Sequence, residues 1–410
     1  MGDVLFPEEG ENYKQKRVNS MKKSLMLGLL AAAFVAGCAP KTEVPASKRA
    51  IVEEEFIFDY QLTRDCHASS LIELENGDLL CTWFGGTRES HPDVQIWLSR
   101  KPVGGAWSEP QPIAKAEEEL GGSVFNPVIV QCGGDTLQLY YLSPDINDGR
   151  VITSCDGGQT WSASKALDKE FTGPLVNKPI YLADGTILAG GSMEGGPGWR
   201  IHVERSTDKG QTWSRTPVLN DPKQFKLIQP TFLAHADGRI QLLARSGGKS
   251  ADTKIAECWS EDGGLTWSEV QNTTLPNNNS AIDAVTLTDG RHLLVYNHST
   301  REDETCGRKG RGILTVAETK DGVNWNAAAV LEYRTGAVQY SYPAMIQTRD
   351  GLVHITYSWH RKRIKHVVID PAKLVTAPIV DGVWPKEELP WIMSADSVAV
   401  NGGRDTEVLK

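Results

Sequence analysis

The stretch Ser154-Cys155-Asp156-Gly157-Gly158-Gln159-Thr160-Trp161 decides the fold, because the chain repeats it. Close copies are Ser206-Thr207-Asp208-Lys209-Gly210-Gln211-Thr212-Trp213 and Ser260-Glu261-Asp262-Gly263-Gly264-Leu265-Thr266-Trp267. A weaker copy ends in Asp321-Gly322-Val323-Asn324-Trp325, and a degenerate one in Gly104-Gly105-Ala106-Trp107. The closing tryptophans stand at positions 107, 161, 213, 267 and 325, so successive copies are 54, 52, 54 and 58 residues apart. A nearly constant period of this length indicates a fold built from repeated units.

Each copy has the chemistry of a turn. The aspartate side chain accepts hydrogen bonds from the backbone of its own turn, and glycine supplies the positive φ that a tight turn needs. β-rich runs precede the turns at 200–205, 255–259 and 313–317. Each turn is therefore expected to join two antiparallel strands. We interpret these turns as structural, lying at the outer edge of the repeated units and away from any central pocket.

A second turn, followed by an apolar strand, lies about half a repeat before each tryptophan. It occurs six times, at Asn76-Gly77, Gly134-Asp135, Asp184-Gly185, Asp237-Gly238, Asp289-Gly290 and Asp350-Gly351. Two hairpins per repeat make about four strands, and six four-stranded units form one closed propeller. The sequence therefore predicts an all-β, six-bladed β-propeller over residues 51–390. Residues near 53–58 are expected to supply the outer strand of the last blade and so close the ring.

The N-terminal 50 residues predict export and lipid anchoring. Residues 21–37 begin with two lysines and continue as a short apolar stretch, the pattern of a secretory signal peptide. The segment Val35-Ala36-Gly37-Cys38 resembles a bacterial lipobox, in which Cys38 becomes the lipidated first residue. We therefore expect Met21 to be the true start, with residues 1–20 a mis-assigned extension. Residues 38–50 are expected to form a tether and 391–410 a polar C-terminal tail.

Localisation follows from that anchor. The expected place is a bacterial cell envelope, either periplasmic or surface-facing, with the membrane contacted only through the lipid. The six cysteines after Cys38 have a spacing that fits neither a disulfide framework nor a zinc site. We expect most of them to be buried thiols, and we expect no metal and no cofactor. A tethered protein has no need to self-associate, so we expect a monomer.

Composition excludes several classes of protein. The chain has 410 residues, of which 40% are hydrophobic and 23% are charged, as in an ordinary globular protein. Its formal net charge of −9 gives no electrostatic footprint for nucleic acid. The most basic run, residues 360–366, alternates its charges around Ile364 and is interpreted as a solvated strand face, with attraction of acidic glycans to the rim as the alternative.

Asp-box turns on a six-bladed pattern in an exported protein resemble the sialidase (neuraminidase) superfamily, also called BNR or Asp-box proteins. The resemblance covers residues 64–370. The segments His67-Ala68-Ser69-Ser70-Leu71 and 76–89 are most similar to a bacterial sialidase-like branch. The resemblance implies the same propeller fold and a site for an acidic sugar at its centre.

The resemblance also implies roles for individual residues. Arg245 and Arg311 match two of the three arginines that hold the substrate carboxylate, and a guanidinium fork suits two carboxylate oxygens. Arg88, next to Glu89, matches an additional substrate-binding arginine. Tyr340, in the pair Tyr340-Ser341, matches the nucleophile. Asp93 matches the acid/base, although an aspartate at the start of a strand can equally be a capping residue.

Two positions depart from the family pattern, and both affect chemistry. His67 stands where the first arginine is expected, so its charge depends on pH. Gln229 stands where a glutamate should activate the tyrosine, and an amide cannot accept the phenol proton. His67 or Glu89 could take that proton instead. The nearby Tyr342, Tyr357 and His360 remain further candidates.

Three functions fit these residues. The first is a sialidase-like exo-glycoside hydrolase that releases a terminal acidic sugar with retention, using tyrosine as nucleophile because a carboxylate would repel an anionic substrate. The second is a uronate lyase, in which tyrosine or histidine removes a proton next to an arginine-neutralised carboxylate. The third is a propeller that binds acidic glycans without catalysis. In each case the expected partner is an acidic oligosaccharide.

Overall fold

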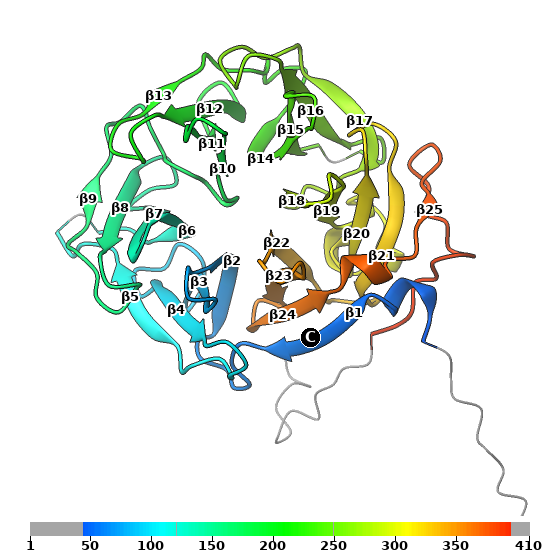
Figure 1. Ribbon diagram of the computed structural model, residues 1–410, viewed down its shortest axis with the longest axis horizontal. Helices are drawn as coiled ribbons and strands as arrows, with labels where there is room; N and C mark the ends of the chain where they lie inside the picture. Colours follow the sequence, from blue (N-terminus) through cyan, green and yellow to red (C-terminus); the bar gives the residue numbers. More distant parts are fainter. Residues whose placement is uncertain (1–43, 120, 249, 395–410) are drawn as a thin grey trace, which may run out of the picture. The chain divides into compact units, whose positions relative to one another are not determined.

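The computed structural model describes residues 44–119, 121–248 and 250–394. Six antiparallel sheets stand around a central axis, and each sheet forms one blade (Figure 1). The innermost strands β2, β6, β10, β14, β18 and β22 surround the axis, and the later strands of each blade lie progressively outward. The predicted all-β, six-bladed propeller is thus confirmed.

The blades follow the chain in order. Blade I contains β2 (Asp65–Glu73), β3 (Leu79–Gly86), β4 (Gln95–Lys101) and β5 (Gln111–Lys115). Blade II contains β6 (Phe125–Gly133), β7 (Thr136–Leu142), β8 (Gly149–Ser154) and β9 (Lys165–Ala166). Blade III contains β10 (Ile180–Tyr181), β11 (Ile187–Met193), β12 (Arg200–Ser206) and β13 (Ser214–Arg215). Blades IV and V contain β14 (Leu227–Ala234), β15 (Ile240–Ser246), β16 (Lys254–Ser260) and β17 (Gln271–Pro276); and β18 (Asp283–Thr286), β19 (His292–Tyr296), β20 (Ile313–Thr319), β21 (Asn326–Tyr333) and β25 (Ala377–Pro378). Blade VI contains β22 (Tyr340–Gln347), β23 (Val353–Trp359), β24 (Arg363–Ile369) and β1 (Ile51–Phe56). Four short 3₁₀ turns complete the described elements: η1 (Ala46–Lys48), η2 (Glu304–Cys306), η3 (Arg308–Gly310) and η4 (Pro371–Lys373).

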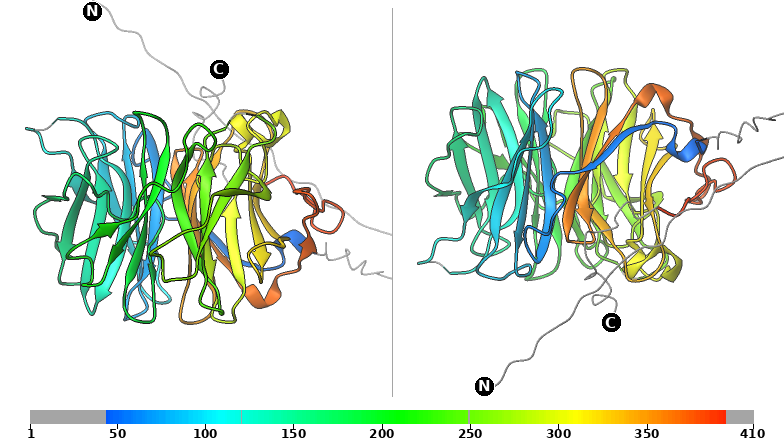
Figure 2. Two further views of the ribbon diagram at one scale, coloured as in Figure 1. Left: turned by 90° about the horizontal axis from the view of Figure 1, so that it is seen from above. Right: turned by 90° about the horizontal axis from the view of Figure 1, so that it is seen from below.

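The N-terminal strand closes the ring. β1 pairs antiparallel with β24 as the outer strand of blade VI, with Glu54 opposite Val367. This is the closure expected for residues 53–58, begun two residues earlier. The outer edge of the blade is thereby covered by a segment from the far end of the chain (Figure 2).

Segments on both sides of the ring extend its packing. Ser47, in the predicted tether, donates to the carbonyl of Pro390, and the Ser394 amide donates to the carbonyl of Tyr333 in β21. Trp384 and Leu389 are buried in the core of blade V. Ordered packing therefore reaches Ser394, beyond the expected end at 390. The predicted extension, signal peptide and Cys38, and the tail from 395 onward, lie outside the described residues.

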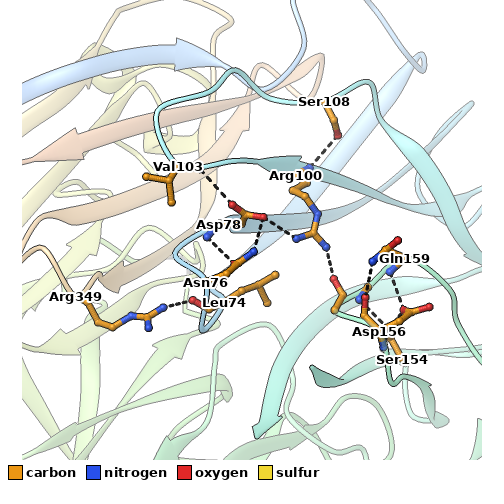
Figure 3. A network of polar contacts seen from close by, with 12 residues as sticks. Leu74, Asn76, Asp78, Arg100, Val103, Ser108, Ser154, Asp156, Gln159 and Arg349 are labelled. Carbon is orange, nitrogen blue, oxygen red and sulfur yellow. Dashed lines mark hydrogen bonds and ion pairs between the residues drawn. The ribbon is translucent and has the colours of Figure 1, made fainter. Parts of the chain in front are cut away.

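The Asp-box turns form the contacts expected of them. Asp156 Oδ1 accepts from the amides of Gln159 and Thr160 at 3.0 and 2.9 Å, and Asp208 and Asp262 repeat this arrangement. These turns join the two outer strands of their blades. Arg100 of β4 links neighbouring blades there, because it bonds Asp78 at 3.1 Å and also the carbonyl of Gly157 (Figure 3). We call this end of the propeller the box face, and the opposite end the loop face.

The basic run at 360–366 is not a solvated face. Arg363, Lys365 and His366 of β24 are buried, because β1 covers the strand from outside. Lys365 donates to Glu332 at 2.6 Å and His366 bonds Glu55 at 2.9 Å. Lys365 is thus paired with blade V and His366 with β1 of its own blade, so these side chains add no cationic surface.

Candidate active site

A repeated backbone irregularity shapes the inner strands near the loop face. In five blades the residue eight positions before the half-repeat turn has positive φ: Ala68, Asn126, Val176, Gln229 and Tyr342. In β2, β6, β14 and β22 this residue lies within a register shift of the ladder. Positive φ is costly for residues other than glycine, and a bulge redirects a side chain out of the regular alternation. The inner strands of five blades therefore have a strained backbone at the same position of the repeat.

Two of these bulged residues meet around one arginine. Arg245 Nη1, at the end of β15, donates to Gln229 Oε1 and to Tyr342 Oη, each at 2.9 Å. Gln229 Nε2 also donates to Tyr342 Oη at 3.3 Å. Arg245 Nε donates to Asn279 Oδ1 at 2.9 Å. The phenol oxygen therefore accepts two hydrogen bonds, one of them a charge-assisted bond from a cation.

Arg311 supplies a second cation beside this group. Its Nη2 donates to the carbonyl of Asn279 at 2.9 Å. Its Nε is buried and has no hydrogen-bond partner among the described residues. Burial, reinforced by the nearby charge of Arg245, lowers the pKa of Arg311 to about 10. No carboxylate of the described residues forms an ion pair with Arg245 or Arg311, so these two cations make a binding site for a negatively charged group.

A cavity of about 460 Å³ opens at these arginines. Its lining is strongly basic and comprises Asp65, Arg245, Asn279, Arg301, Arg308, Lys309, Arg311, Gln339 and Arg361. Arg361, in the β23–β24 turn, bonds Asp65 at 2.7 Å and Glu89 at 2.9 Å. Sequence reasoning missed Arg361, because it stands in the run that was interpreted as a solvated strand.

His67 lies against the tyrosine of this group. Its ring centroid is 4.2 Å from that of Tyr342, and its Nδ1 is 2.9 Å from the Ser358 hydroxyl. Burial, together with the charges of Arg361, Arg311 and Arg245, holds the pKa of His67 well below its ordinary value. The ring is therefore neutral at pH 7 and does not replace the missing arginine as a cation.

Tyr340, predicted as nucleophile, is not part of this group. Its side chain is 0% exposed and packs in the core cluster shared by blades V and VI. The register shift between Ser341 and Ala344 explains the difference, because it brings Tyr342 to Arg245 while Tyr340 stays in regular pairing with Trp359. The signal was in the sequence, since Tyr342-Pro343 aligns with Gln229-Pro230 eight residues before the turn.

The β3–β4 loop carries the other predicted residues. Glu89 contacts Arg361 and so borders the site, whereas Arg88 is exposed. Asp93 accepts from the Thr87 hydroxyl at 2.6 Å and the Thr87 amide at 3.0 Å, and it bonds His91 at 2.7 Å. These hydrogen bonds, those of Thr87 first, lower the pKa of Asp93. Asp93 thus caps its own loop, and its side chain is 49% exposed.

One acid missed by sequence reasoning has the opposite electrostatic character. Glu194 lies in the β11–β12 loop, and burial raises its pKa although Arg245 opposes the shift. Trp199 of the same loop places its ring 5.7 Å from the guanidinium carbon of Arg245. The loop therefore adds a carboxyl group that tends to keep its proton and an indole surface beside the arginines.

Two other features, a metal-binding cluster and a membrane-spanning helix, are absent from the described residues. In the described ranges, no cluster of three or more His, Cys, Asp or Glu side chains could hold a metal ion. The described part of the chain also has no helix with the length and apolar character of a membrane span.

Comparisons with known protein structures agree with the propeller fold. Solved structures with the same fold include a protein of unknown function from Dyadobacter fermentans, with 17% identity, a TM-score of 0.61, and 78% of this chain and 98% of that chain covered. The NanB sialidase from Streptococcus pneumoniae has 14% identity and a TM-score of 0.57, covering 78% and 71%. An α-L-arabinanase from Penicillium chrysogenum has 17% identity and a TM-score of 0.57, covering 79% and 99%.

The remaining comparisons concern sequence. No curated protein matched the chain. The model of the BNR repeat-like domain matches residues 77–355, which is most of the propeller and more than half of the chain. With its repeated Asp-box turns and six-bladed sialidase-like propeller, the chain belongs to the BNR repeat-like domain family.

Proposed function

We propose that the protein is a propeller glycoside hydrolase that removes a terminal acidic sugar, such as sialic acid, from glycans. The observation that carries the proposal is the placement of Tyr342 Oη at 2.9 Å from Arg245, beside Arg311 and a basic cavity. The two arginines bind the sugar carboxylate, and Tyr342 takes the role of nucleophile that the sequence suggested for Tyr340. Similar folds include a sialidase and an arabinanase, which supports a glycoside hydrolase in general.

Acid catalysis in this proposal falls to Glu194 rather than Asp93. A general acid must carry its proton at the working pH, and the raised pKa of Glu194 favours that state. The hydrogen bonds of Thr87 favour the ionised form of Asp93 instead. The neutral His67 ring, 4.2 Å from that of Tyr342, would accept the phenol proton as Tyr342 Oη attacks the anomeric carbon, and Glu194 would protonate the leaving oxygen as the glycosidic bond breaks. Water would then attack the anomeric carbon of the glycosyl-enzyme and give a proton to the ionised Glu194. The sugar leaves with retention, and Tyr342 recovers its proton from His67.

A uronate lyase is the second candidate, and Gln229 is the observation that favours it. The residue beside Tyr342 Oη is an amide, so the family's usual route for activating the nucleophile is missing. Removal of a proton next to an arginine-bound carboxylate needs only a base near that carbon. Tyr342 and the neutral His67 are both placed for such a step.

Two tyrosine variants in one strand test the proposal. Purified protein is incubated with a fluorogenic sialoside and, separately, with uronate polysaccharides, and both fluorescence and the ultraviolet absorbance of unsaturated products are followed. Sugar release that Tyr342→Phe abolishes and Tyr340→Phe preserves supports the hydrolase with Tyr342 as nucleophile. Unsaturated product without sugar release points to the lyase. Glycan binding with neither product leaves a binding propeller.

We also propose export and attachment to a bacterial envelope through Cys38. This part rests on the signal-peptide pattern of residues 21–38 alone. Metabolic labelling with a radioactive or clickable fatty acid tests it, because Cys38→Ser should abolish the label.

A further inference from the structure

The loop between β19 and β20 adds cations that a single carboxylate does not require. Arg301, Arg308 and Lys309 of this loop line the same cavity as Arg245 and Arg311. Neither the Arg301 nor the Arg308 guanidinium is hydrogen-bonded or ion-paired to another of the described residues. Of the residues that line the cavity, only Asp65 is acidic, and Arg361 already binds it at 2.7 Å.

Backbone contacts hold the loop that carries these cations beside the cavity. Arg308 lies between Gly307 and Lys309, which both have positive φ, and its amide donates to the carbonyl of Val338 at 2.9 Å. The Lys309 carbonyl accepts from Asn278 Nδ2 at 3.2 Å. A Cβ on Gly310 would collide with the Thr300 carbonyl oxygen, so the loop closes tightly on itself. Because the backbone of the loop is already held beside the cavity, only the side chains of Arg301 and Arg308 have to be ordered when an anion binds.

Arg311, which lines the cavity together with Arg245 and the cations of the β19–β20 loop, is not ion-paired with any described carboxylate. Arg311 has a buried Nε with no hydrogen-bond partner among the described residues, and burial first and the charge of Arg245 second lower its pKa to about 10. One bound carboxylate can pair with Arg245 and Arg311 by a bidentate contact. Arg301 and Arg308 then still have no counter-charge, and a neutral neighbouring sugar would supply none.

We propose that Arg301 and Arg308 bind a second anionic group of the substrate. The substrate class is then an oligosaccharide in which the sugar next to the terminal acidic unit carries a sulfate ester or a second carboxylate. This inference rests on the proposed function, since it takes the first carboxylate to lie on Arg245 and Arg311.

The test compares matched ligands with one and two anionic groups. Uncleavable thio-linked sialyl and glucuronyl disaccharides are each prepared plain, with one sulfate ester on the second sugar, and with a carboxylate there. Calorimetry on the full-length protein at low salt should show about tenfold tighter binding of at least one two-anion ligand than of its plain partner, as a charge-assisted contact predicts. Whether the sulfated or the carboxylated form shows the gain identifies the second group.

Variants then locate the second group. Arg301→Ala/Arg308→Ala should abolish that gain, so that this variant binds the plain ligand and its two-anion partner with affinities that agree within about twofold. The control Lys165→Ala/Arg215→Ala removes two exposed charges from the outer strands β9 and β13 and should retain the gain. Two-anion ligands that bind no more tightly than their plain partners, or a gain that survives Arg301→Ala/Arg308→Ala, would overturn the inference. Arg245→Ala separates this result from the proposed function, which fails if that variant binds the plain ligand as the wild type does.

Discussion

Tyr342 and Gln229 hold the same place in two different repeats, and their side chains meet. Each stands eight residues before the aspartate of its turn, and each is followed by proline. Their φ angles are 52° and 57°, and Gln229 Nε2 lies 3.3 Å from Tyr342 Oη, although 113 residues separate them in the chain. The same position of two repeats thus supplies both Tyr342 and Gln229 to the site around Arg245.

A glutamate at position 229 should increase turnover. Gln229→Glu places a carboxylate beside Tyr342 Oη, where it can accept the phenol proton that the amide cannot. General-base catalysis contributes roughly 10²–10⁴-fold, and pairing of the new carboxylate with Arg245 will weaken it. We expect kcat on the substrate cleaved by the wild type to rise by at least about tenfold. Gln229→Met, which adds no base, is the control, and a kcat no higher for the glutamate variant than for the wild type would refute this role.

The centre of the ring contains a pair whose disruption should destabilise the protein. Asp283 of β18 is 1% exposed and accepts from Lys178 Nζ, from the Thr231 hydroxyl at 2.9 Å and from the Met345 amide at 2.7 Å. These partners come from blades III, IV and VI or the segments that lead into them. The single carboxylate therefore joins four blades.

Removing the cation of this pair leaves a buried charge without compensation. Lys178→Met should lower the free energy of unfolding by about 3–5 kcal/mol, as for other broken buried pairs. Lys178→Met/Asp283→Asn should recover much of that loss, because neither member is then charged. Urea titration followed by tryptophan fluorescence measures both variants. Equal midpoints for Lys178→Met and the wild type would show that the pair does not stabilise the ring.

The repeat made the fold predictable, because hydrogen bonds within each Asp-box turn determine the turn and can be recognised from neighbouring residues. Asp156 bonds only residues within four positions of itself, so the eight-residue box carries its whole structure. The same alignment would also have located Tyr342, had the register been counted from the turn instead of matched to a Tyr-Ser pair. Arg245 and Arg311 were found from the resemblance to the sialidase superfamily, in which one arginine lies on the strand after the fourth repeat's turn and another just before a strand of the fifth repeat.

The rest of the site depends on contacts that no local pattern reveals. Arg361 meets Asp65 across 296 positions, and only the closure of the ring brings blade VI against blade I. The electrostatic contrast between Glu194 and Asp93 comes from burial of the first and the local hydrogen bonds of the second. Burial of 363–366 depends on β1, a strand from the other end of the chain.

The Asp-box turns should matter for stability and not for activity. Asp208 accepts from the Gln211 amide and from both the amide and hydroxyl of Thr212, and these bonds lower the pKa of Asp208 to about 2. Asp208→Ala should therefore lower Tm measurably while leaving kcat/KM unchanged, because the turn lies on the box face. The exposed Asp168 provides the control, since Asp168→Ala should shift neither quantity. A loss of kcat/KM in Asp208→Ala at a temperature where it remains folded would contradict this separation.

Two stacked histidines should make the ring sensitive to mild acid. His354 Nδ1 lies 2.9 Å from His366 Nε2, and His366 Nδ1 lies 2.9 Å from Glu55 of the closing strand β1. Burial first, and the charge of His366 second, lower the pKa of His354 to about 4, with Asp350 and Glu55 opposing and Lys101 reinforcing the shift. The unfolded chain therefore takes up this proton at a higher pH than the folded one. Stability from His354 is complete above about pH 6.5 and is lost as the pH falls towards 4.

The variant His354→Gln isolates this contribution, because the amide can hydrogen-bond but does not titrate. Each pH unit in that window corresponds to about 1.4 kcal/mol at most, so the slope of unfolding free energy against pH should be shallower in the variant by up to that amount. Urea titrations between pH 6.5 and 5.5 measure the slope above the range in which Glu55 contributes. Burial raises the pKa of Glu55, but the bonds of His366 and Lys101 outweigh it and lower the pKa from 4.5 to about 2, so Glu55 contributes mainly below about pH 5. Parallel slopes for His354→Gln and the wild type would show that the histidine stack does not make the closure of the ring sensitive to pH.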